Sequence, residues 1–242
     1  MIAFLESCTW QQAVAFFAAA NGVSFGVSVA GCRALSMVFR TRQIFEETEP
    51  LRRLDVVAAV SAVFLNALIS VLGWFLWRNG WIVLDEGGVL DSLWDCFFML
   101  MAMDLGMYIF HRLAHWRPIY DRIHNFHHRH ETTNPISLFV LHPFEVVGFG
   151  LLMIGFLVIY PMTVLGLVAY LSLNVIFGTV GHSGVEPFPR FFASVPILKY
   201  LGTSTFHASH HEQPGYNFGF YTLIWDRLFG TLDPSYDRRF AR

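Results

Sequence analysis

Long stretches without any charged residue constrain this chain more than any other feature. Ser7 to Cys32 (26 residues) and Val56 to Trp77 (22 residues) contain no Asp, Glu, Lys or Arg. About 20 apolar residues suffice for a helix to cross the hydrocarbon core of a bilayer. Only 14% of the residues are charged, against about 25% in a typical soluble domain. The sequence therefore predicts an integral membrane protein with its first two spans in these runs.

Two further apolar stretches follow these spans. Cys96 to Phe110 is interrupted only by Asp104, and Val146 to Gly181 is an uncharged run of 36 residues that contains Pro161. Proline disfavours continuation of a helix because it lacks an N–H and its ring clashes with the preceding turn. We therefore expect a third crossing helix and then an apolar helical hairpin. A single long kinked helix is the alternative.

The N-terminal segment and the cysteines complete the prediction of the membrane region. The opening MIAFLESCTWQQ has no basic residue before its apolar run, which favours a retained helix over a cleaved signal peptide. Cys8, Cys32 and Cys96 lie far apart and form no CxxC motif, as is typical of apolar fillers in helices. We expect a single domain, 1–242, with membrane helices in 1–95 and a histidine-rich region in 96–233.

The placement of arginine predicts the orientation of the helices. The loop between the first two runs carries five arginines, whereas the next loop has only Arg78 beside four acidic residues. Loops rich in Lys and Arg stay on the cytoplasmic side. Three crossings and a hairpin then bring residues 111–145 and 182–242 to that side. The predicted fold is an all-α integral membrane protein with about three crossing helices, an apolar helical hairpin and a cytoplasmic histidine-rich helical cap.

Eight of the eleven histidines form three motifs. These are HxxxH at His111 and His115, HxxHH at His124, His127 and His128, and a second HxxHH at His207, His210 and His211. On a helix, positions i, i+3 and i+4 share a face, so each motif would present its imidazoles together. Imidazole binds zinc, copper, iron and nickel, whereas Mg²⁺ and Ca²⁺ prefer oxygen. One structural zinc needs four ligands, so the count predicts two ions in a shared cage.

Three single histidines lie outside these motifs. His142 and His182 flank the apolar hairpin, one before and one after it, and each is a candidate to complete the cage. His130 stands between Arg129 and Glu131. It lies off the face of the first HxxHH motif, so we expect a solvated loop residue.

Carboxylates near the motifs are candidates to support the metal ligands. Asp104 stands alone in an apolar run, where a charge is costly unless it is paired. Metal-bound histidines usually donate their other ring N–H to a carboxylate or carbonyl. Asp104 is therefore a candidate acceptor for His111 or a neighbouring ligand, and a hydrogen bond between helices is the alternative. Glu145 and Asp226 are lesser candidates for the same role.

The motifs HRLAH, HNFHH and HASHH, followed by YNFGFYTLIWDRLFGT, resemble the fatty acid hydroxylase superfamily. This membrane group includes sterol desaturases, sterol C4-methyl oxidases, cholesterol 25-hydroxylase and sphingolipid hydroxylases. LHPFE and HSGVEPFP resemble segments of the C4-methyl oxidase branch, and the match is closest to that branch and to cholesterol 25-hydroxylase-like proteins. The resemblance covers residues 95–233, whereas the first 90 residues match only as apolar helices.

The resemblance implies a non-haem di-iron centre that uses O₂ to hydroxylate an unactivated C–H bond of a lipid. The implied ligands are His111, His115, His124, His127, His128, His142, His182, His207, His210 and His211. Zinc is an expected substitute in purified protein. Asn217 of the Asn-x-Gly segment and Asp226 of Trp-Asp-Arg are expected around the ligands. Two positions depart from the family pattern: Gly178 replaces a histidine found in some members, and Phe218 replaces the usual tyrosine.

The partners follow from the same chemistry. The lipid substrate would enter from the bilayer. The sequence contains no GxGxxG motif and no CxxC set, so electrons would come from an external ferredoxin or cytochrome b₅-like donor with its reductase. A net charge of −2 gives no indication of nucleic acid.

Other functions would use part of the same sequence pattern. A lipid desaturase would share the same ligands. GHSG (Gly181 to Gly184) looks like the motif of an intramembrane serine protease, but such a site leaves the three histidine motifs unexplained. A metal transporter or a haem protein also uses paired histidines, although transport needs ligands spread along a path across the membrane.

Overall fold

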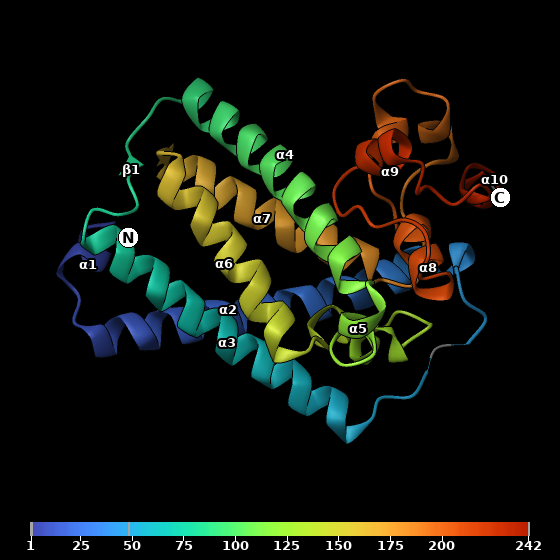
Figure 1. Ribbon diagram of the computed structural model, residues 1–242, viewed down its shortest axis with the longest axis horizontal. Helices are drawn as coiled ribbons and strands as arrows, with labels where there is room; N and C mark the ends of the chain where they lie inside the picture. Colours follow the sequence, from blue (N-terminus) through green and yellow to red (C-terminus); the bar gives the residue numbers. More distant parts are fainter. Residues whose placement is uncertain (1, 48, 242) are drawn as a thin grey trace.

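The computed structural model describes residues 2–47 and 49–241, and nearly all of its regular structure is helical (Figure 1). The α-helices are α1 (Ile2–Ser7), α2 (Trp10–Val38), α3 (Arg53–Arg78), α4 (Val89–Ala114), α5 (Arg117–Tyr120), α6 (Pro143–Ile159), α7 (Val164–Gly181), α8 (Ser204–Glu212), α9 (Ile224–Phe229) and α10 (Tyr236–Phe240). The 3₁₀-helices are η1 (Arg40–Arg42), η2 (His124–Arg129), η3 (Ser137–Phe139), η4 (Arg190–Ala193) and η5 (Leu198–Tyr200), and the strands are β1 (Leu84–Asp85) and β2 (Met162–Thr163).

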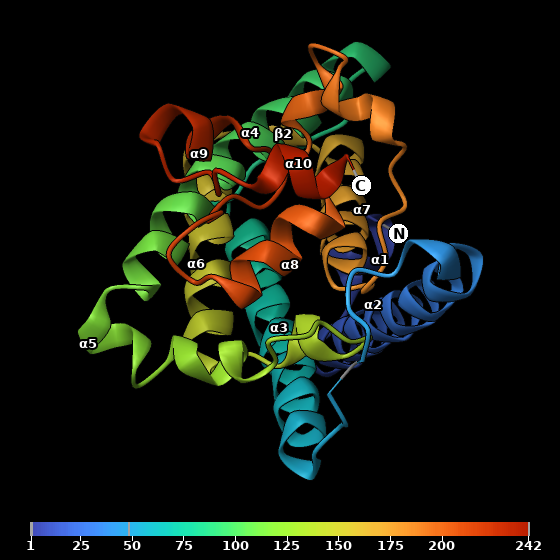
Figure 2. The same ribbon diagram turned by 90° about the vertical axis from the view of Figure 1, so that its right-hand side faces the viewer.

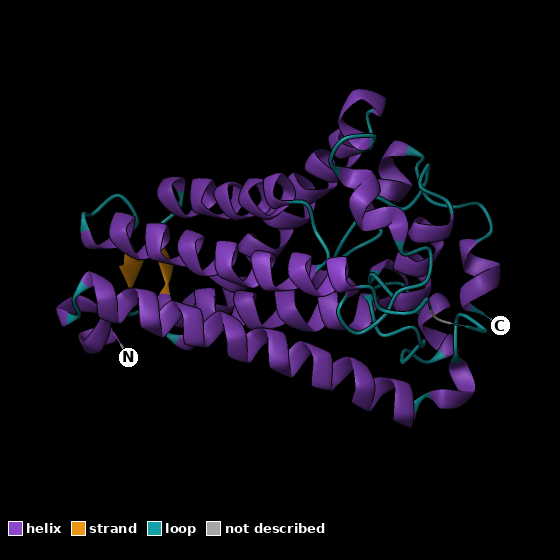
Figure 3. Ribbon diagram, turned by 90° about the horizontal axis from the view of Figure 1, so that it is seen from below, coloured by secondary structure: helices purple, strands orange, loops and turns teal. Residues whose placement is uncertain are grey.

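Long apolar helices dominate the fold. Among the described residues, α2, α3, α4 and α7 are long and apolar enough to cross a membrane, and α6 is an apolar helix of 17 residues. Figure 3 shows these helices running along one another, with loops gathered at one end. The predicted all-α fold with an apolar helical hairpin is confirmed: α6 and α7 form the hairpin, and its second arm is the fourth long helix.

The hairpin turn contains Pro161, at the point where the sequence predicted a break. It lies beside the connection between α3 and α4, because β1 and β2 pair in parallel there. Asp95 of α4 fixes this turn by accepting hydrogen bonds from Thr163 N (2.6 Å) and Tyr160 Oη (2.9 Å). Both arms of the hairpin therefore reach the same end of the bundle as α3 and α4.

Small residues allow the helices to pack closely. A Cβ added at Gly106 of α4 would lie 3.0 Å from the Leu152 side chain of α6, and one added at Gly148 of α6 would lie 2.4 Å from Phe110. Such small residues are typical of helix contacts in membranes, because apolar lipid supplies no hydrophobic force that drives helices together. The outer faces carry exposed apolar side chains such as Phe64 (61% exposed) and Phe97 (56%), as expected for a surface in contact with lipid.

The first helices and the cysteines follow the sequence prediction. The chain enters through α1 and α2, and α1 is tied to the end of α3 because Trp74 Nε1 donates to Leu5 O (2.8 Å). Cys8, Cys32 and Cys96 are all free and buried. No disulfide links the described residues.

Short helices and loops form a cap at the end of the bundle opposite β1. In Figure 1, α8, α9 and α10 lie at this end with the C-terminus, and α5 lies below them. One link between cap and bundle is Asp104 of α4, which accepts hydrogen bonds from Tyr221 N (2.8 Å), Thr222 N (3.2 Å) and Thr222 Oγ1. The expectation that Asp104 supports a histidine is wrong, because its carboxylate binds this segment instead. The alternative, an internal hydrogen bond to another segment, is the one observed.

Replacing Asp104 by Leu is expected to lower the melting temperature of the purified protein. The change leaves two buried N–H groups and one hydroxyl without their acceptor, and each unsatisfied buried donor costs about 1–3 kcal/mol. We expect a fall of at least about 6 °C, measured by scanning fluorimetry in detergent. Asp104→Asn keeps one carbonyl acceptor and should lie between the wild type and Asp104→Leu. Equal melting temperatures for all three proteins would contradict this role.

Candidate metal centre

The three histidine motifs and His182 lie on four segments that meet at the cap. His111 and His115 lie at the end of α4, and His182 follows the last residue of α7. The second HxxHH motif lies on α8, and Figure 2 shows α8 beside the ends of these helices. The first HxxHH motif lies on η2, a 3₁₀-helix, where we expected an α-helix. All four segments bring their side chains to one end of the bundle.

Nine imidazoles form two groups, each able to hold a metal ion. The five-histidine group contains His111, His115, His124, His128 and His210, and the four-histidine group contains His127, His182, His207 and His211. Within each group, one ring nitrogen from every member lies within 4.8 Å of the others. The sequence count predicted two ions, and the geometry provides two groups.

Each HxxHH motif contributes to both groups. His124 and His128 belong to the five-histidine group, whereas His127 belongs to the four-histidine group. The second motif is divided in the opposite sense, with only His210 in the five-histidine group. Consecutive residues on an α- or 3₁₀-helix point about 100–120° apart. The adjacent pair at the end of each motif therefore directs one ring to each group.

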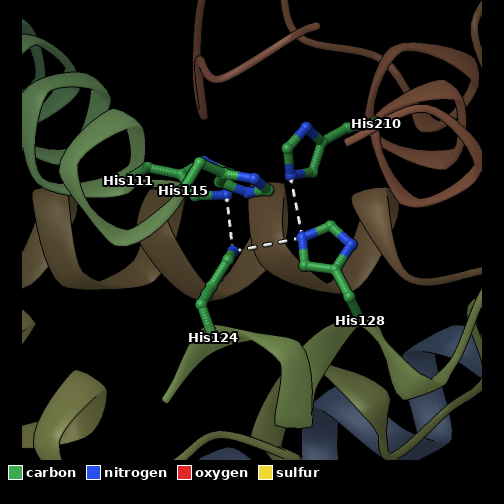
Figure 4. A group of neighbouring side chains, drawn as sticks. All are labelled: His111, His115, His124, His128 and His210. Carbon is green, nitrogen blue, oxygen red and sulfur yellow. Dashed lines mark hydrogen bonds between the residues drawn. The ribbon is translucent and has the colours of Figure 1, made fainter. Parts of the chain in front are cut away.

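Figure 4 shows the five side chains of the five-histidine group. Hydrogen bonds to groups outside it fix the protonation of their ring nitrogens. His111 Nδ1 lies 2.9 Å from Phe218 O, and His210 Nδ1 lies 2.6 Å from Tyr216 O. A carbonyl oxygen only accepts, so both Nδ1 atoms carry the proton and both Nε2 atoms present a lone pair. His124 Nδ1 likewise donates to the Glu145 carboxylate.

These tautomers leave nitrogen lone pairs facing one another. His111 Nε2 lies 3.1 Å from His124 Nε2, and neither atom carries a proton in the neutral ring. His115 Nε2 is buried and has no hydrogen-bond partner among the described residues. A cation between the rings would turn this repulsion into coordination, so the donor set fits a metal ion that prefers nitrogen.

The four-histidine group is fixed in the same way. His127 Nδ1 donates to Val140 O (3.1 Å), and His211 Nδ1 donates to His130 O (2.8 Å). Ser137 Oγ donates to Asn134 O and therefore accepts from His182 Nδ1 (2.7 Å). His182 Nε2 and His211 Nε2 lie 2.9 Å and 3.2 Å from His207 Nε2. Lone pairs again converge on a single point.

Burial keeps these imidazoles neutral. Removal from water lowers the pKa of His124 and of His127 to about 4. Burial also lowers the pKa of His128, His210 and His211, to which neighbouring histidines contribute in the same direction. A neutral ring is the form that binds a metal, so the site is prepared for coordination near pH 7.

The structure does not bring every sequence candidate to the two groups. His142 lies outside both, because it precedes α6 and its Nδ1 accepts from Phe144 N (3.3 Å). Glu145, one of the lesser candidates, is the carboxylate that contacts a histidine of the groups directly. His182, whose role was open on spacing alone, belongs to the four-histidine group.

Asp226 and Asn217 act through the backbone of the loop that follows α8. Asp226 accepts from Phe218 N and Gly219 N (both 2.8 Å). It therefore holds the segment whose carbonyl oxygens fix His111 and His210. Burial raises the pKa of Asp226 to about 6. Asn217 has a left-handed backbone (φ 61°) and joins α8 to the tail through Phe206 O and Asp233 N. Neither side chain contacts a ring in the hydrogen bonds observed.

His130 corrects a sequence expectation. We expected a solvated loop residue, but the side chain is 1% exposed. Its Nε2 lies 3.1 Å from Asp55 Oδ1, and its Nδ1 lies 3.7 Å from Glu49 Oε2. Its own carbonyl accepts from His211. The spacing of the histidines gave no sign that His130 is buried, because Glu49 and Asp55 are distant from it in the sequence. They lie just before α3 and in its first turn.

Two buried groups of imidazoles at one end of an apolar helical bundle define a membrane metalloprotein. A family model described as fatty acid hydroxylase matches residues 96–231, more than half of the 242-residue chain. The chain therefore belongs to the fatty acid hydroxylase family. This confirms the resemblance recognised in the histidine motifs and the C-terminal segment.

Relatives with known names include plant and fungal proteins. Very-long-chain aldehyde decarbonylase GL1-7 of Oryza sativa subsp. japonica is 28% identical over 207 residues, which are 82% of this chain and 31% of the relative. Protein CER1-like 2 of Arabidopsis thaliana is 34% identical over 137 residues, 54% of this chain and 22% of the relative. The Delta(7)-sterol 5(6)-desaturase of Candida dubliniensis is 29% identical over 220 residues, 86% of this chain and 54% of the relative.

The chain is short beside these relatives. It spans 22–54% of their lengths. No solved structure matches it.

Replacing Glu145 by Gln is expected to weaken metal binding by about 10–100-fold, because such outer partners raise the basicity of a ligand and fix its orientation. The measurement is metal retention during titration with a chelator. Asp95→Asn serves as the control, since Asp95 is also a buried carboxylate but lies at the opposite end of the bundle. Equal metal retention in the Glu145 variant and the wild type would refute the assignment.

The metal-free protein is expected to lose stability as the pH falls from about 6.5 to 4. In this range the unfolded chain, with histidine pKa near 6.5, binds more protons than the folded chain, whose His124 and His127 have pKa values of about 4. The free energy of unfolding therefore decreases as the pH is lowered. The measurement is urea unfolding in detergent at several pH values.

Two variants make this pH test specific. His127→Gln should flatten the slope, because it removes one buried group that titrates. His142→Gln should leave the slope unchanged, since His142 lies outside both histidine groups. A slope that is the same in all three proteins would show that the buried imidazoles do not govern the pH dependence.

Proposed function

We propose that the protein is a membrane-bound non-haem di-iron oxygenase that uses O₂ and external electrons to hydroxylate an unactivated C–H bond of a lipid. The observation that carries this proposal is the pair of all-imidazole groups at one end of a bundle of apolar helices. Membership of the fatty acid hydroxylase family supports the same reaction class.

Nine histidines are proposed as ligands, five to one iron and four to the other. They are the members of the two groups already defined, and they do not include His142. Bound iron would supply the oxidising chemistry, which no side-chain acid or base can provide for a lipid C–H bond. Zinc, which also suits imidazole, is proposed as a substitute in purified protein.

The chain's own groups prepare the site for this chemistry. Glu145 and the carbonyl oxygens of Phe218 and Tyr216 hold three rings with their Nε2 lone pairs inward. Phe218 packs against the rings of His115 and His210, with centroids 5.2 and 5.6 Å apart. These contacts orient the ligands and exclude water from one side of the five-histidine group.

Hydroxylation is favoured, and desaturation is the alternative within the family. One relative is named as a sterol desaturase and another as a very-long-chain aldehyde decarbonylase. Both names concern substrates that are largely hydrocarbon. The mass of the product separates the two reactions, since hydroxylation adds one oxygen atom and desaturation removes two hydrogen atoms.

The orientation and the electron donor are part of the proposal. Positively charged loops favour the cytoplasmic side, and the loop between α2 and α3 carries five arginines. The cap lies at the same end as this loop, because Glu49 Oε1 accepts from Glu131 N (3.1 Å). A separate ferredoxin or cytochrome b₅-like protein with its reductase would then deliver electrons to the cap from the cytoplasm.

Metal analysis tests the two-ion proposal. We expect about two iron atoms per chain after expression with iron, measured by elemental analysis. His127→Ala leaves three imidazoles in the four-histidine group, the smaller of the two, and should lower the metal content toward one ion per chain. His115→Ala leaves four imidazoles in its group and should keep more metal. One ion or none in the wild type would refute the di-iron assignment.

The same preparations supply the control and the activity test. His142→Ala should keep full metal content, because His142 belongs to neither group. With iron, a reductase system and O₂, the wild type should convert a membrane lipid to a product 16 mass units heavier, detected by mass spectrometry of total lipids. A product two mass units lighter would instead support the desaturase.

A further inference from the structure

An open pocket leads from the surface of the cap to the five-histidine group. It has a volume of about 570 Å³, and its walls include Arg112, His115, Trp116, Arg117, Tyr120 and Phe218. Figure 2 shows α5, which supplies Arg117 and Tyr120, at the outer edge of the molecule beyond the end of α4. His115 is a member of the five-histidine group, and its buried Nε2 has no hydrogen-bond partner in residues 2–47 and 49–241. A ligand in this pocket would therefore lie directly against the group.

The charges in the pocket are all of one sign. Arg112 and Arg117 are both exposed. Neither forms an ion pair within the described part of the chain, where Arg227 and Arg239 are the arginines paired with carboxylates. The remaining wall is aromatic or apolar. A guanidinium binds carboxylate and phosphate groups in a bidentate manner, so the polar part of a fitting ligand is anionic.

A chain of hydrogen bonds orients Arg112 toward this role. Thr231 Oγ1 donates to Asp226 (2.7 Å) and therefore accepts from Tyr108 Oη (3.0 Å). The Tyr108 oxygen is then free to accept from Arg112 Nη1 (3.3 Å). Asp226 thus fixes the arginine through two hydroxyl groups without neutralising it by direct contact.

The mouth of the pocket borders the surface that faces lipid. Leu113 and Trp116, which follow Arg112 along the chain, are 56% and 62% exposed, and Ile109 one turn earlier is 50% exposed. Long arginine side chains at the end of a membrane helix place their charge at the interface while their methylene groups lie along apolar surface. A molecule with an anionic end and a hydrocarbon chain matches both parts of this environment.

We propose that this pocket binds the substrate as an anionic amphiphile, with its carboxylate or phosphate on Arg112 and Arg117 and its nearest carbon atoms against His115. This inference rests on the proposed oxygenase function, and it assigns the substrate to lipids that carry a negative charge. Carbon atoms close to the anionic group would be the ones oxidised, because the pocket brings that end of the molecule to the histidines.

Direct binding tests the inference without turnover. The purified metal-loaded protein in dodecyl maltoside is titrated with radiolabelled palmitate, hexadecyl phosphate and hexadecanol, which share a chain length and differ in charge. We expect at least one of the two anions to bind at least ten-fold more tightly than the alcohol. The double variant Arg112→Gln/Arg117→Gln should lose that preference and keep its metal content. The two anions distinguish a carboxylate from a phosphate headgroup.

Arg122→Gln is the matched control. Arg122 is exposed one turn beyond α5, where its guanidinium donates to Pro118 O (2.9 Å), and it is not part of the pocket wall. Its variant should bind the anions as the wild type does. Equal binding of palmitate, hexadecyl phosphate and hexadecanol would overturn the inference. Unchanged anion binding by the double variant would also overturn the inference. This holds even if the double variant impairs electron transfer from a donor protein.

The two proposals fail separately in this design. If the protein oxidises a neutral lipid but shows no preference for anions, the oxygenase function stands and the pocket assignment is wrong. If anions bind through the two arginines but no lipid is oxidised under any condition, the pocket assignment stands and the oxygenase function is wrong.

Discussion

The convergence of imidazole lone pairs is the constraint on which the rest of this structure depends. Nitrogen atoms without protons approach to about 3 Å among largely buried rings, and a cation between them makes that arrangement favourable. The carbonyl oxygens of Val140 and Phe218 and the Glu145 carboxylate hold the rings in these tautomers. The helices α4 and α7 and the loop after α8 are arranged so that these acceptors face the rings.

Much of the fold and part of the site were predictable from the sequence, because hydropathy and histidine spacing are local signals. Uncharged runs gave the long helices, and Pro161 gave the hairpin turn. The motifs gave eight of the nine grouped histidines. The division of each HxxHH motif between two groups was not predictable, since it depends on where neighbouring segments lie. Asp104 and His130 were misjudged for the same reason: their partners are 117 and 75 residues away in the chain.

Membership of the fatty acid hydroxylase family concerns the part of the chain that holds the histidine groups. The family match covers residues 96–231, which include all nine grouped histidines and the Asp226 carboxylate. The relatives carry names of a desaturase and of decarbonylases. Proteins with different named reactions are therefore similar in sequence to this chain. Surroundings of the histidine groups, such as the walls near His115, are where differences in substrate would arise.

The order of the site residues along the chain has a consequence for biogenesis. His111 belongs to the first motif to emerge during synthesis, yet its tautomer is set by Phe218 O, and that loop is held by Asp226. The ribosome must add 115 residues between His111 and Asp226, which takes on the order of ten seconds. During that interval the helices of the hairpin must enter the bilayer. The five-histidine group, which includes His210, is thus incomplete until the C-terminal region has been made, so a metal ion could be held there only late in synthesis.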